Sequence, residues 1–378
     1  MFNRRDLVQA SLCLPMVHAA TGLLSVARAQ GGDRAAADMA SFIAGLPKAE
    51  YHVHLEGTLE ADMKLALAER NGLKLPYADA VAIRASYEYH DLPSFLAVYY
   101  SGMSVLLKEQ DFYDLTHAYL AKAASQNVLY AEMFFDPQEH LKRGVPIEAV
   151  IGGITRARLD GQRDLGIRSQ LILCFLRDLS PESAMAALDA ALPMKQYLVG
   201  VGLDSDEKDN PPGKFAAHFA KARAAGLKVT THCDLNQKNT LEHIREAIVD
   251  LKVDRIDHGG NVLQSPELVT LAKKRGLFFT VCPNFSGQVV GPKGNVDVVR
   301  GMLDEGLNVT INSDDPAYMG GKYLTEVLAE AQVRSSLTPA ELVRIERNAF
   351  NAAWISPAER RPYLDRLDAF AKAWGLTA

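Results

Sequence analysis

Histidine and aspartate side chains that could bind a metal ion recur near the ends of short apolar segments. His52 and His54 are two residues apart, so on a strand both side chains would point to the same face. His232 and Asp314 end two later apolar segments and would complete a set of three imidazoles and one carboxylate. This donor set favours one zinc ion per chain, with iron, cobalt or manganese as alternatives, and a catalytic site keeps one coordination position for water.

Two further residues follow strand-like segments and could act on that water. Zinc lowers the pKa of bound water toward about 7, and His258 could serve as a general base or hold this water. Asp315 is expected to point away from Asp314 and to orient the substrate or the nucleophile. Taken alone, Asp315-Pro316 would also suit an ordinary turn. Together these residues predict a hydrolytic metal site.

Eight apolar segments alternate with helical segments and could position these side chains. The predicted strands are residues 49–54, 128–135, 170–176, 198–203, 227–232, 255–258, 277–282 and 308–312. Helices are predicted between them, for example at 214–225, 240–251, 266–275 and 296–305. Eight such units favour an α/β fold of the (β/α)8 TIM-barrel type over an open sheet. In that barrel, catalytic residues lie where the strands end.

A long insertion and a helical tail depart from the regular alternation. The segment between the first two predicted strands has helical character at 59–70 and 92–107. In a barrel this insertion would lie on the catalytic face, where it could cover the mouth as a lid. Residues from Leu324 onward continue as helices, including 339–353 and 358–374, which we expect to pack around the outside.

Residues 1–29 have the pattern of an export signal. Arg4-Arg5 precede an apolar stretch at 10–26, and Ala27 and Ala29 provide small residues for cleavage after position 29. The paired arginines favour the twin-arginine route over an ordinary Sec signal. The sequence therefore predicts a periplasmic or secreted protein, with residues 30–378 as a single domain and no stable membrane association after cleavage.

Composition limits the partners that the chain could have. The 378 residues are 48% hydrophobic and 23% charged, with a net charge of −5. No basic stripe is present, so we expect a small-molecule partner and no nucleic acid. After signal cleavage Cys174, Cys233 and Cys282 remain, widely spaced in apolar runs, and we expect buried thiols and no disulfide framework. The sequence carries no signal for an oligomeric state.

The ordered motifs resemble the adenosine/adenine deaminase family of the metal-dependent amidohydrolase superfamily. The resemblance extends from Pro47 to about Ala353 and rests on KAEYHVHLEGTL at 48–59, RIDHG at 255–259 and NSDDP at 312–316. FFDPQEH at 134–140 and GLDSDE at 202–207 are similar to the adenine deaminase branch.

This resemblance implies hydrolytic attack at C6 of a 6-aminopurine, either nucleoside or nucleobase, with release of ammonia. It implies the following site residues: metal ligands His52, His54, His232 and Asp314; catalytic residues His258 and Asp315; and substrate contacts Glu56, Asp136, Ser205 and Asp206.

One position departs from the family pattern. The family carries a glutamate three residues after the strand-five histidine, where it gives a proton to N1 of the ring, and Leu235 stands there. General acid catalysis contributes about 10²–10⁴-fold. Asp234 is the nearest replacement as a catalytic acid, with Gln237 as a neutral donor.

Three functions therefore remain open: a 6-aminopurine deaminase with a relocated acid, a deaminase or amidohydrolase of another N-heterocycle, and a catalytically weak purine-binding protein. The complete metal and base set favours the first.

Overall fold

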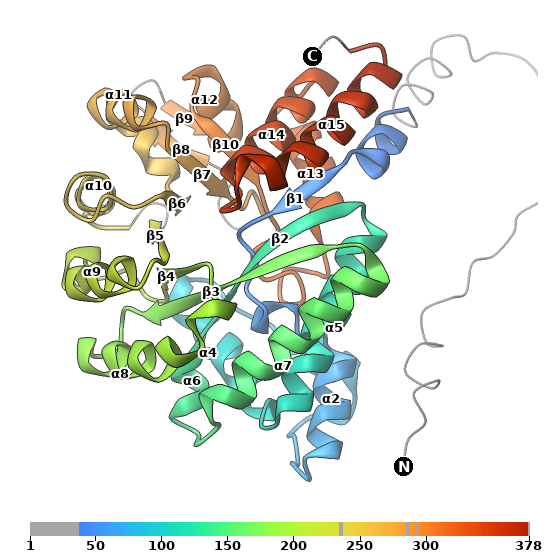
Figure 1. Ribbon diagram of the computed structural model, residues 1–378, viewed down its shortest axis with the longest axis vertical. Coiled ribbons are helices and arrows are strands. Elements are labelled where there is room, and N and C mark those ends of the chain that lie inside the picture. The colour runs from blue at the N-terminus through green and yellow to red at the C-terminus, as the bar shows by residue number, and fades with distance from the viewer. Residues whose placement is uncertain (1–37, 234–236, 285–287, 292–293, 377–378) are drawn as a thin grey trace, which may run out of the picture. The chain divides into compact units, whose positions relative to one another are not determined.

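A ring of parallel strands forms the centre of the structure (Figure 1). The computed structural model describes residues 38–233, 237–284, 288–291 and 294–376, and Ala40–Ala378 forms one compact unit. The strands pair in the order β1-β2-β3-β4-β5-β6-β7-β10. Their bounds are Lys48–Glu50, Val128–Phe135, Arg168–Leu176, Gly200–Asp204, Lys228–Cys233, Arg255–His258, Phe278–Val281 and Asn308–Ile311. All eight predicted strands are present: β2 and β6 have the predicted bounds, and the ends of the others differ from the prediction by at most four residues.

The segments after β1 and β10 close the ring. Asp314 N donates to His52 O over 2.9 Å, and His54 N donates to Asp314 O over 3.0 Å. A single parallel bridge joins Val53 to Asp314. The predicted (β/α)8 barrel is therefore confirmed, and its closure lies at the residues expected to do chemistry.

The first strand ends earlier than predicted. A strand was expected over 49–54, but β1 covers Lys48–Glu50, and His52 and His54 follow it in an extended segment. The reason is a side chain that takes the place of the ladder: Asn312 Oδ1 accepts hydrogen bonds from Tyr51 N (2.9 Å) and His52 N (3.2 Å). The two histidines still point into the same site.

Helices cover the outside of the ring between successive strands (Figure 1). Several begin with a serine or threonine cap and a proline in the first turn, which together fix the start of a helix. The helices after β2 are α6 (Pro137–Leu141), α7 (Ile147–Asp160), α8 (Pro181–Ala191), α9 (Ala216–Ala224), α10 (Thr240–Arg245), α11 (Pro266–Arg275), α12 (Val298–Asp304), α13 (Leu324–Arg334), α14 (Pro339–Ala352) and α15 (Pro357–Ala373). None of the helices in the described ranges is long and apolar enough to cross a membrane.

A hairpin replaces part of one predicted helix. A helix was expected over 296–305, but β8 (Gln288–Gly291) and β9 (Gly294–Asp297) pair antiparallel before α12 begins at Val298. Asp297 ends the hairpin and caps the helix, because its Oδ1 accepts a hydrogen bond from Arg300 N over 2.9 Å. The helical prediction was wrong for Val296 and Asp297, which belong to β9.

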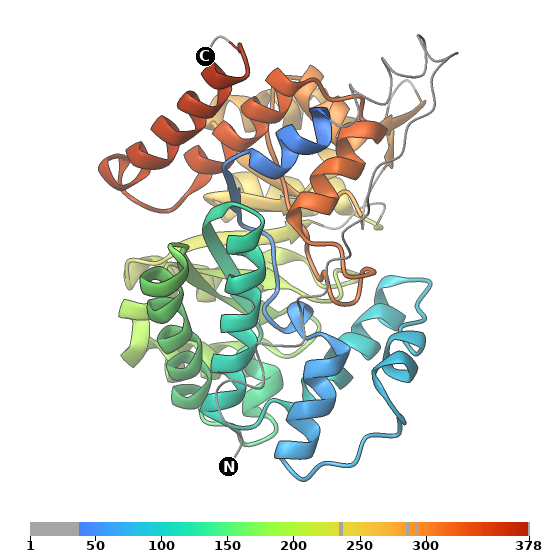
Figure 2. The ribbon, with the colours of Figure 1, turned by 90° about the vertical axis from the view of Figure 1, so that its right-hand side faces the viewer.

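The first part of the insertion between β1 and β2 lies beside one end of the ring, in blue and cyan in Figure 2, and its last helix packs on the outside of the barrel beside α7. It contains α2 (Ala61–Arg70), α3 (Ala80–Ala85), α4 (Leu92–Gly102) and α5 (Glu109–Ser125). Phe95 and Tyr99 of α4 pack with Ala317 and Tyr318, which follow β10. This contact places α4 over the carboxyl ends of the strands, as expected for a lid.

Candidate active site

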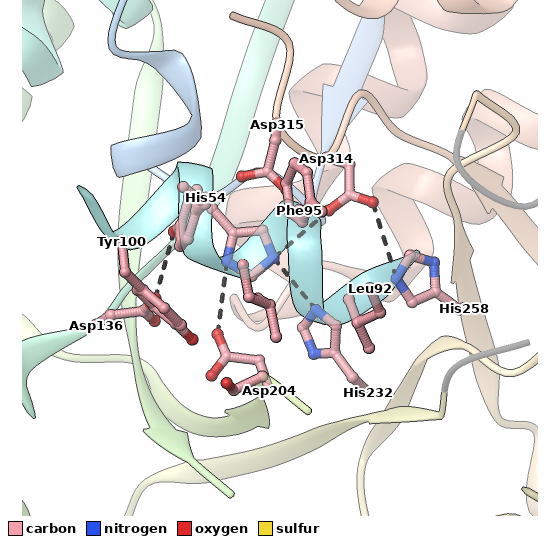
Figure 3. Close-up of a pocket in the computed structure, with 13 residues that line it drawn as sticks. His54, Leu92, Phe95, Tyr100, Asp136, Asp204, His232, His258, Asp314 and Asp315 are labelled. Carbon is pink, nitrogen blue, oxygen red and sulfur yellow. Dashed lines mark hydrogen bonds and ion pairs between the residues drawn. The ribbon is translucent and has the colours of Figure 1, made fainter. Parts of the chain in front are cut away.

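The imidazoles of His52, His54 and His232 and the carboxylate of Asp314 converge at the carboxyl ends of the strands. Figure 3 shows His54, His232 and Asp314 of this set. His54 Nε2 lies 3.2 Å from His232 Nε2. Asp314 Oδ1 lies 3.3 Å from His52 Nε2 and 3.5 Å from His54 Nε2. All four side chains are buried, so these atoms face one another without bulk water between them.

The other nitrogen of each imidazole faces an oxygen outside this cluster. His52 Nδ1 lies 3.0 Å from Thr280 O, and the Nδ1 atoms of His54 and His232 each lie 3.5 Å from a carboxylate, Asp204 and Asp257. A hydrogen on Nδ1 leaves Nε2 with a lone pair, and such outward partners orient metal-binding histidines. Lone pairs at these separations repel unless a cation lies among them. The four residues therefore fit a divalent metal ion.

The protonation states also suit a cation. Burial lowers the pKa of His54 to about 4 and that of His232 well below its usual value. Burial would raise the pKa of Asp314, but the imidazoles of His52, His258 and His54 outweigh it and hold that pKa below its usual range. Metal ligands must be neutral imidazole and ionised carboxylate, and the shifts of His54, His232 and Asp314 favour these forms, whereas burial of His52 is outweighed by the charge of Asp314, which raises the pKa of His52.

His258 and Asp315 lie next to the four ligand candidates. His258 Nε2 is 3.8 Å from Asp314 Oδ2, and burial, together with His52, lowers the pKa of His258 to about 3. Asp315 was expected to point away from Asp314, yet single carboxylate oxygens of both lie within 4.8 Å of His54 and of each other. Burial and the charge of Asp314 raise the pKa of Asp315 well above its usual value. The structure thus brings all six predicted metal and catalytic side chains that it describes into one cluster.

The backbone at this site is held in an unfavourable conformation. His258 and Asp314 have φ angles of 57° and 66°, and Ser205 has 73°. Left-handed backbone at residues other than glycine costs on the order of 1–3 kcal/mol each and persists where the surroundings enforce it. A second constraint is the close approach of Asp315 to Gly57. Only glycine allows this approach, because a Cβ at position 57 would lie 2.0 Å from Asp315 Oδ1.

The cluster forms one wall of a pocket with about 410 Å³ of space between atoms, open solvent at the mouth included. Helix α4 supplies the opposite wall through Leu92, Phe95, Leu96, Tyr99 and Tyr100. None of these five residues was among the predicted site residues. Their spacing of three, four, seven and eight positions is the pattern of one helix face and was the available signal.

The predicted substrate contacts divide into two groups. Asp136 and Ser205 line the pocket. Glu56 and Asp206 are not among the residues that line it: Glu56 Oε1 lies 2.7 Å from His140 Nε2 and accepts from Asp136 N, and Asp206 Oδ1 accepts from Lys208 N. Asp234, predicted as the catalytic acid, and Leu235 lie outside the described residues.

Asp204, which ends β4, also lines the pocket, and single carboxylate oxygens of Asp204 and Asp136 lie within 4.8 Å of each other. Burial, followed by the charges of Asp204 and Glu56, raises the pKa of Asp136 well above its usual value. Burial raises the pKa of Asp204 to about 7. Both carboxyl groups therefore hold a proton more tightly than a carboxyl group in water.

The three cysteines of the described chain are buried and form no disulfide bond with one another, as expected from the sequence.

Comparison with known proteins bears on the class of this barrel. The sequence profile of the adenosine deaminase family matches residues 47–370. An uncharacterized deaminase of Schizosaccharomyces pombe is 56% identical over 89% of this chain and 99% of its own length. An adenine deaminase of Rhodospirillum rubrum is 47% identical over 87% of this chain and 98% of its own length.

Solved structures agree with these sequence matches. The adenine deaminase of Arthrobacter aurescens is 37% identical with a TM-score of 0.81, over 86% of this chain and 99% of that one. An amidohydrolase of Burkholderia ambifaria with bound Zn is 28% identical with a TM-score of 0.79, over 88% of this chain and 94% of that one.

The barrel and its cluster of donors thus define a metal-dependent hydrolase of the amidohydrolase superfamily. Within it, the chain belongs to the adenosine deaminase family. The function expected from the sequence, hydrolytic deamination of a 6-aminopurine, is confirmed. The protein is a hydrolase that acts on C–N bonds of cyclic amidines, and its partner is a small molecule.

Proposed function

We propose that this chain deaminates a free 6-aminopurine base, with adenine as the prototype, and that it uses zinc held by His52, His54, His232 and Asp314. The observation that carries the proposal is the convergence of three Nε2 atoms and one carboxylate beside a pocket lined by His258 and Asp315. Relatives named adenine deaminase and a solved amidohydrolase with bound Zn support the substrate and the metal.

Two features of the pocket favour a free base over a nucleoside. The wall formed by α4 is apolar and aromatic, which suits the faces of a planar ring better than a sugar. Glu56, an acidic side chain predicted to contact the substrate, is not among the residues that line the pocket, and its Oε1 is held by His140 and by the backbone of Asp136.

Bound zinc would supply a water of lowered pKa and a positive charge at the reacting centre. His258 borders the same pocket and is placed to take the proton that this water loses on attack at C6. Asp315, held close to Gly57, is placed to hydrogen-bond to the ring and to the nucleophile. The wall of α4 limits the entry of bulk water around the ring.

The reaction needs a donor for the ring as well as a base for the water. When oxygen adds to C6, the electron pair of the C6–N1 double bond moves to N1, which takes up a proton. N6 then takes up the proton that His258 removed from the water, the C6–N6 bond breaks and ammonia leaves. The hydroxyl proton on C6 returns to the group that protonated N1, so adenine and water give hypoxanthine and ammonia. Because leucine cannot donate at position 235, we propose that Asp234 supplies the proton to N1, with Gln237 as the neutral alternative.

A substrate panel tests this proposal. We expect the purified, zinc-loaded protein to release ammonia rapidly from adenine and slowly or not at all from adenosine, deoxyadenosine, guanine, cytosine and pterins. Asp234→Asn should lower kcat for adenine by about 10²-fold or more. Unchanged turnover in this variant would exclude Asp234 as the acid, and silence on adenine would exclude the proposed substrate.

Leucine at position 235 also allows a second function, the deamination of another amino-substituted N-heterocycle. A ring that needs no protonation beside the reacting carbon would tolerate leucine there. Activity on another ring of the panel, together with silence on adenine, would favour this alternative. Metal binding with silence on every ring would favour a purine-binding protein.

We also propose that the protein acts outside the cytoplasm, because residues 1–29 have the pattern of a twin-arginine signal. Cell fractionation tests this directly: recovery of the mature protein in the cytoplasm would contradict it.

A further inference from the structure

Arg177 is a fully buried side chain that lies outside the set of metal, catalytic and pocket residues. It follows β3 directly, and its guanidinium group spans two backbone carbonyl oxygens. Nη1 donates to His232 O over 2.9 Å, and Nε donates to Asn210 O over 2.8 Å. Fully buried arginine is uncommon, because taking a cation out of water costs free energy. A cation kept at this depth indicates that its hydrogen bonds perform a task that an apolar residue could not.

The two carbonyl groups lie on opposite sides of a gap in the barrel. β4 pairs with β3 as far as Asp204, and β5 pairs with β6 as far as Cys233. Between β4 and β5, however, the pairing ends at Val201 and Val229. Although both strands are fully described by the structure, their carboxyl ends therefore share no hydrogen-bonded ladder.

Arg177 connects the two sides of this gap. On the side of β5 it holds His232, whose Nε2 faces the other proposed metal ligands. On the side of β4 it holds Asn210, whose side chain donates to Asp206 O over 3.0 Å in the loop that begins at Ser205. Ser205 and His232 both line the pocket. One guanidinium group therefore fixes the end of β5 relative to the loop after β4.

The backbone of Arg177 is itself held from both sides. Its N donates to Asp204 O over 3.1 Å, and its O accepts from Lys214 Nζ over 2.9 Å. The guanidinium group thus extends from a fixed point of the barrel. Groups that orient a metal ligand from outside the ligand set commonly change metal affinity by about 10- to 100-fold.

We propose that Arg177 is a positioning residue that takes the place of the β4–β5 ladder and holds the backbone of His232 where its ring can bind the metal ion. This inference rests on the proposed function, since it assumes that His232 is a zinc ligand. Asp257 faces the Nδ1 atom of His232 at 3.5 Å, whereas Arg177 fixes the backbone from which that ring extends.

The zinc affinity of the purified protein tests this role. Arg177→Met removes the guanidinium group and keeps a long apolar side chain. We expect its zinc dissociation constant, measured by competition with a chelator, to rise about 10- to 100-fold. Arg177→Lys keeps a cation but loses the planar fork that spans both carbonyl groups, so the constant should rise by at least about threefold and by less than in Arg177→Met.

Arg158→Met is the matched control, because Arg158 forms the same kind of contact at the other end of β3. Its Nη2 donates to Ser169 O over 2.7 Å, and its Nη1 donates to Tyr197 O over 2.9 Å. Loss of these hydrogen bonds should lower the melting temperature. The zinc dissociation constant should change by less than about threefold, because Arg158 contacts no part of the metal site.

A double-mutant cycle shows whether Arg177 acts through His232. His232→Ala removes the proposed ligand and keeps the carbonyl group that Arg177 holds, and it should weaken zinc binding by itself. Adding Arg177→Met to His232→Ala should weaken zinc binding by less than about threefold further, because the ring to be positioned is gone. Losses that multiply independently would contradict the proposal.

Two other results would refute the role of Arg177: an unchanged zinc dissociation constant in Arg177→Met, or an equal loss of affinity in Arg158→Met. If Arg177→Met does not fold, Arg177→Lys decides, since wild-type affinity in that variant would also refute the role. A wild-type protein that binds no zinc would refute the metal assignment and this inference together.

Adenine turnover of the wild-type preparation separates this inference from the proposed substrate. Turnover, with unchanged zinc affinity in Arg177→Met, refutes the positioning role alone. A loss of affinity that depends on His232, without turnover of adenine by wild type, supports the positioning role and refutes the proposed substrate.

Discussion

Two kinds of buried carboxyl group lie at different depths of the same barrel. Glu132 and Asp136 are four residues apart, one within β2 and one directly after it, and both are at most 1% exposed. Glu132 Oε1 accepts from Tyr130 Oη (2.8 Å) and Trp354 N (2.7 Å), and its Oε2 accepts from Arg255 Nη1 (2.8 Å). Asp136 accepts two fewer hydrogen bonds from the described chain.

Glu50 and Asp204 repeat this difference on other strands. Glu50 Oε1 accepts from Ser313 N and Oγ, and its Oε2 accepts from Tyr119 Oη over 2.7 Å. Asp204 instead faces a second carboxyl group and an imidazole at 3.5 Å. Burial is common to all four groups, so burial alone does not mark a functional site. Carboxyl groups whose donors come from the protein hold the barrel together, and those that lack donors are available to a ligand.

The largest effect is expected on catalysis, when one of the proposed metal ligands or the metal itself is removed. His52→Ala, or chelation of wild type, should lower kcat/KM for adenine by about 10³-fold or more, because several kcal/mol of charge stabilisation are lost. The free energy of unfolding of the metal-free protein should change little, since the site holds repelling lone pairs without a cation. Metal analysis and steady-state rates check this, and zinc should rescue chelated wild type. A fully active variant with a full complement of metal would show that His52 is not a ligand.

A smaller effect, on the free energy of unfolding, is expected from a substitution of Glu132 within the barrel. Glu132→Leu leaves Arg255 as a buried cation without its closest carboxylate and should lower the free energy of unfolding by about 3–5 kcal/mol. The kcat of the folded protein should stay within about threefold, because Glu132 does not line the pocket. Urea denaturation measures the change in the free energy of unfolding, and activity assays measure the change in kcat. As a control, Glu359→Gln removes the exposed partner of Arg168 and should cost much less.

The smallest effect concerns how the free energy of unfolding changes with pH through the buried carboxyl group of Glu346, which contacts β1. Glu346 accepts from Ala49 N, and burial raises its pKa to about 8. Because this exceeds the usual value of 4.5, the folded chain binds more protons than the unfolded chain between the two values, so stability falls as pH rises through this window. Glu346→Gln keeps an acceptor and removes this titration.

The difference in unfolding free energy, wild type minus Glu346→Gln, should therefore fall by about 1–2 kcal/mol between pH 5 and pH 7. Lys48, the charged neighbour of Glu346, has its pKa lowered to about 8 by burial and lies outside this range. Urea denaturation at three pH values measures the difference. A difference that stays constant would mean that Glu346 is ionised throughout.

Local sequence patterns predicted the barrel well because they report on nearby residues. Runs of apolar residues gave the eight strands, and the identity of the residues at their ends gave the cluster of metal and catalytic side chains. The end of β1 could not be predicted, because it depends on Asn312, which is distant in sequence. The hairpin before α12 was missed for a similar reason: residues 296 and 297 suit a helix start, and their pairing with β8 decides otherwise.

The roles of the pocket residues were harder to predict than the barrel, because they depend on contacts between residues that are far apart in the sequence. The sequence gives no sign that Glu56 is occupied by His140, eighty-four positions away. Nor does it show that Asp136 meets Asp204, because the two carboxylates belong to different strands. The face of α4 was readable as an amphipathic stripe, but only its contact with Tyr318 shows that it faces the pocket.

The close approach at Gly57 restricts how the enzyme could be evolved in the laboratory. Any other residue would place a Cβ 2.0 Å from Asp315 Oδ1 and 2.8 Å from the Asp315 Cα, so side chain and backbone would both have to move. Random libraries aimed at new amino-heterocycles should therefore recover no active clone with a substitution at this codon. Diversity is better placed in α4, where Leu92 and Leu96 line the pocket and only side chains need to change.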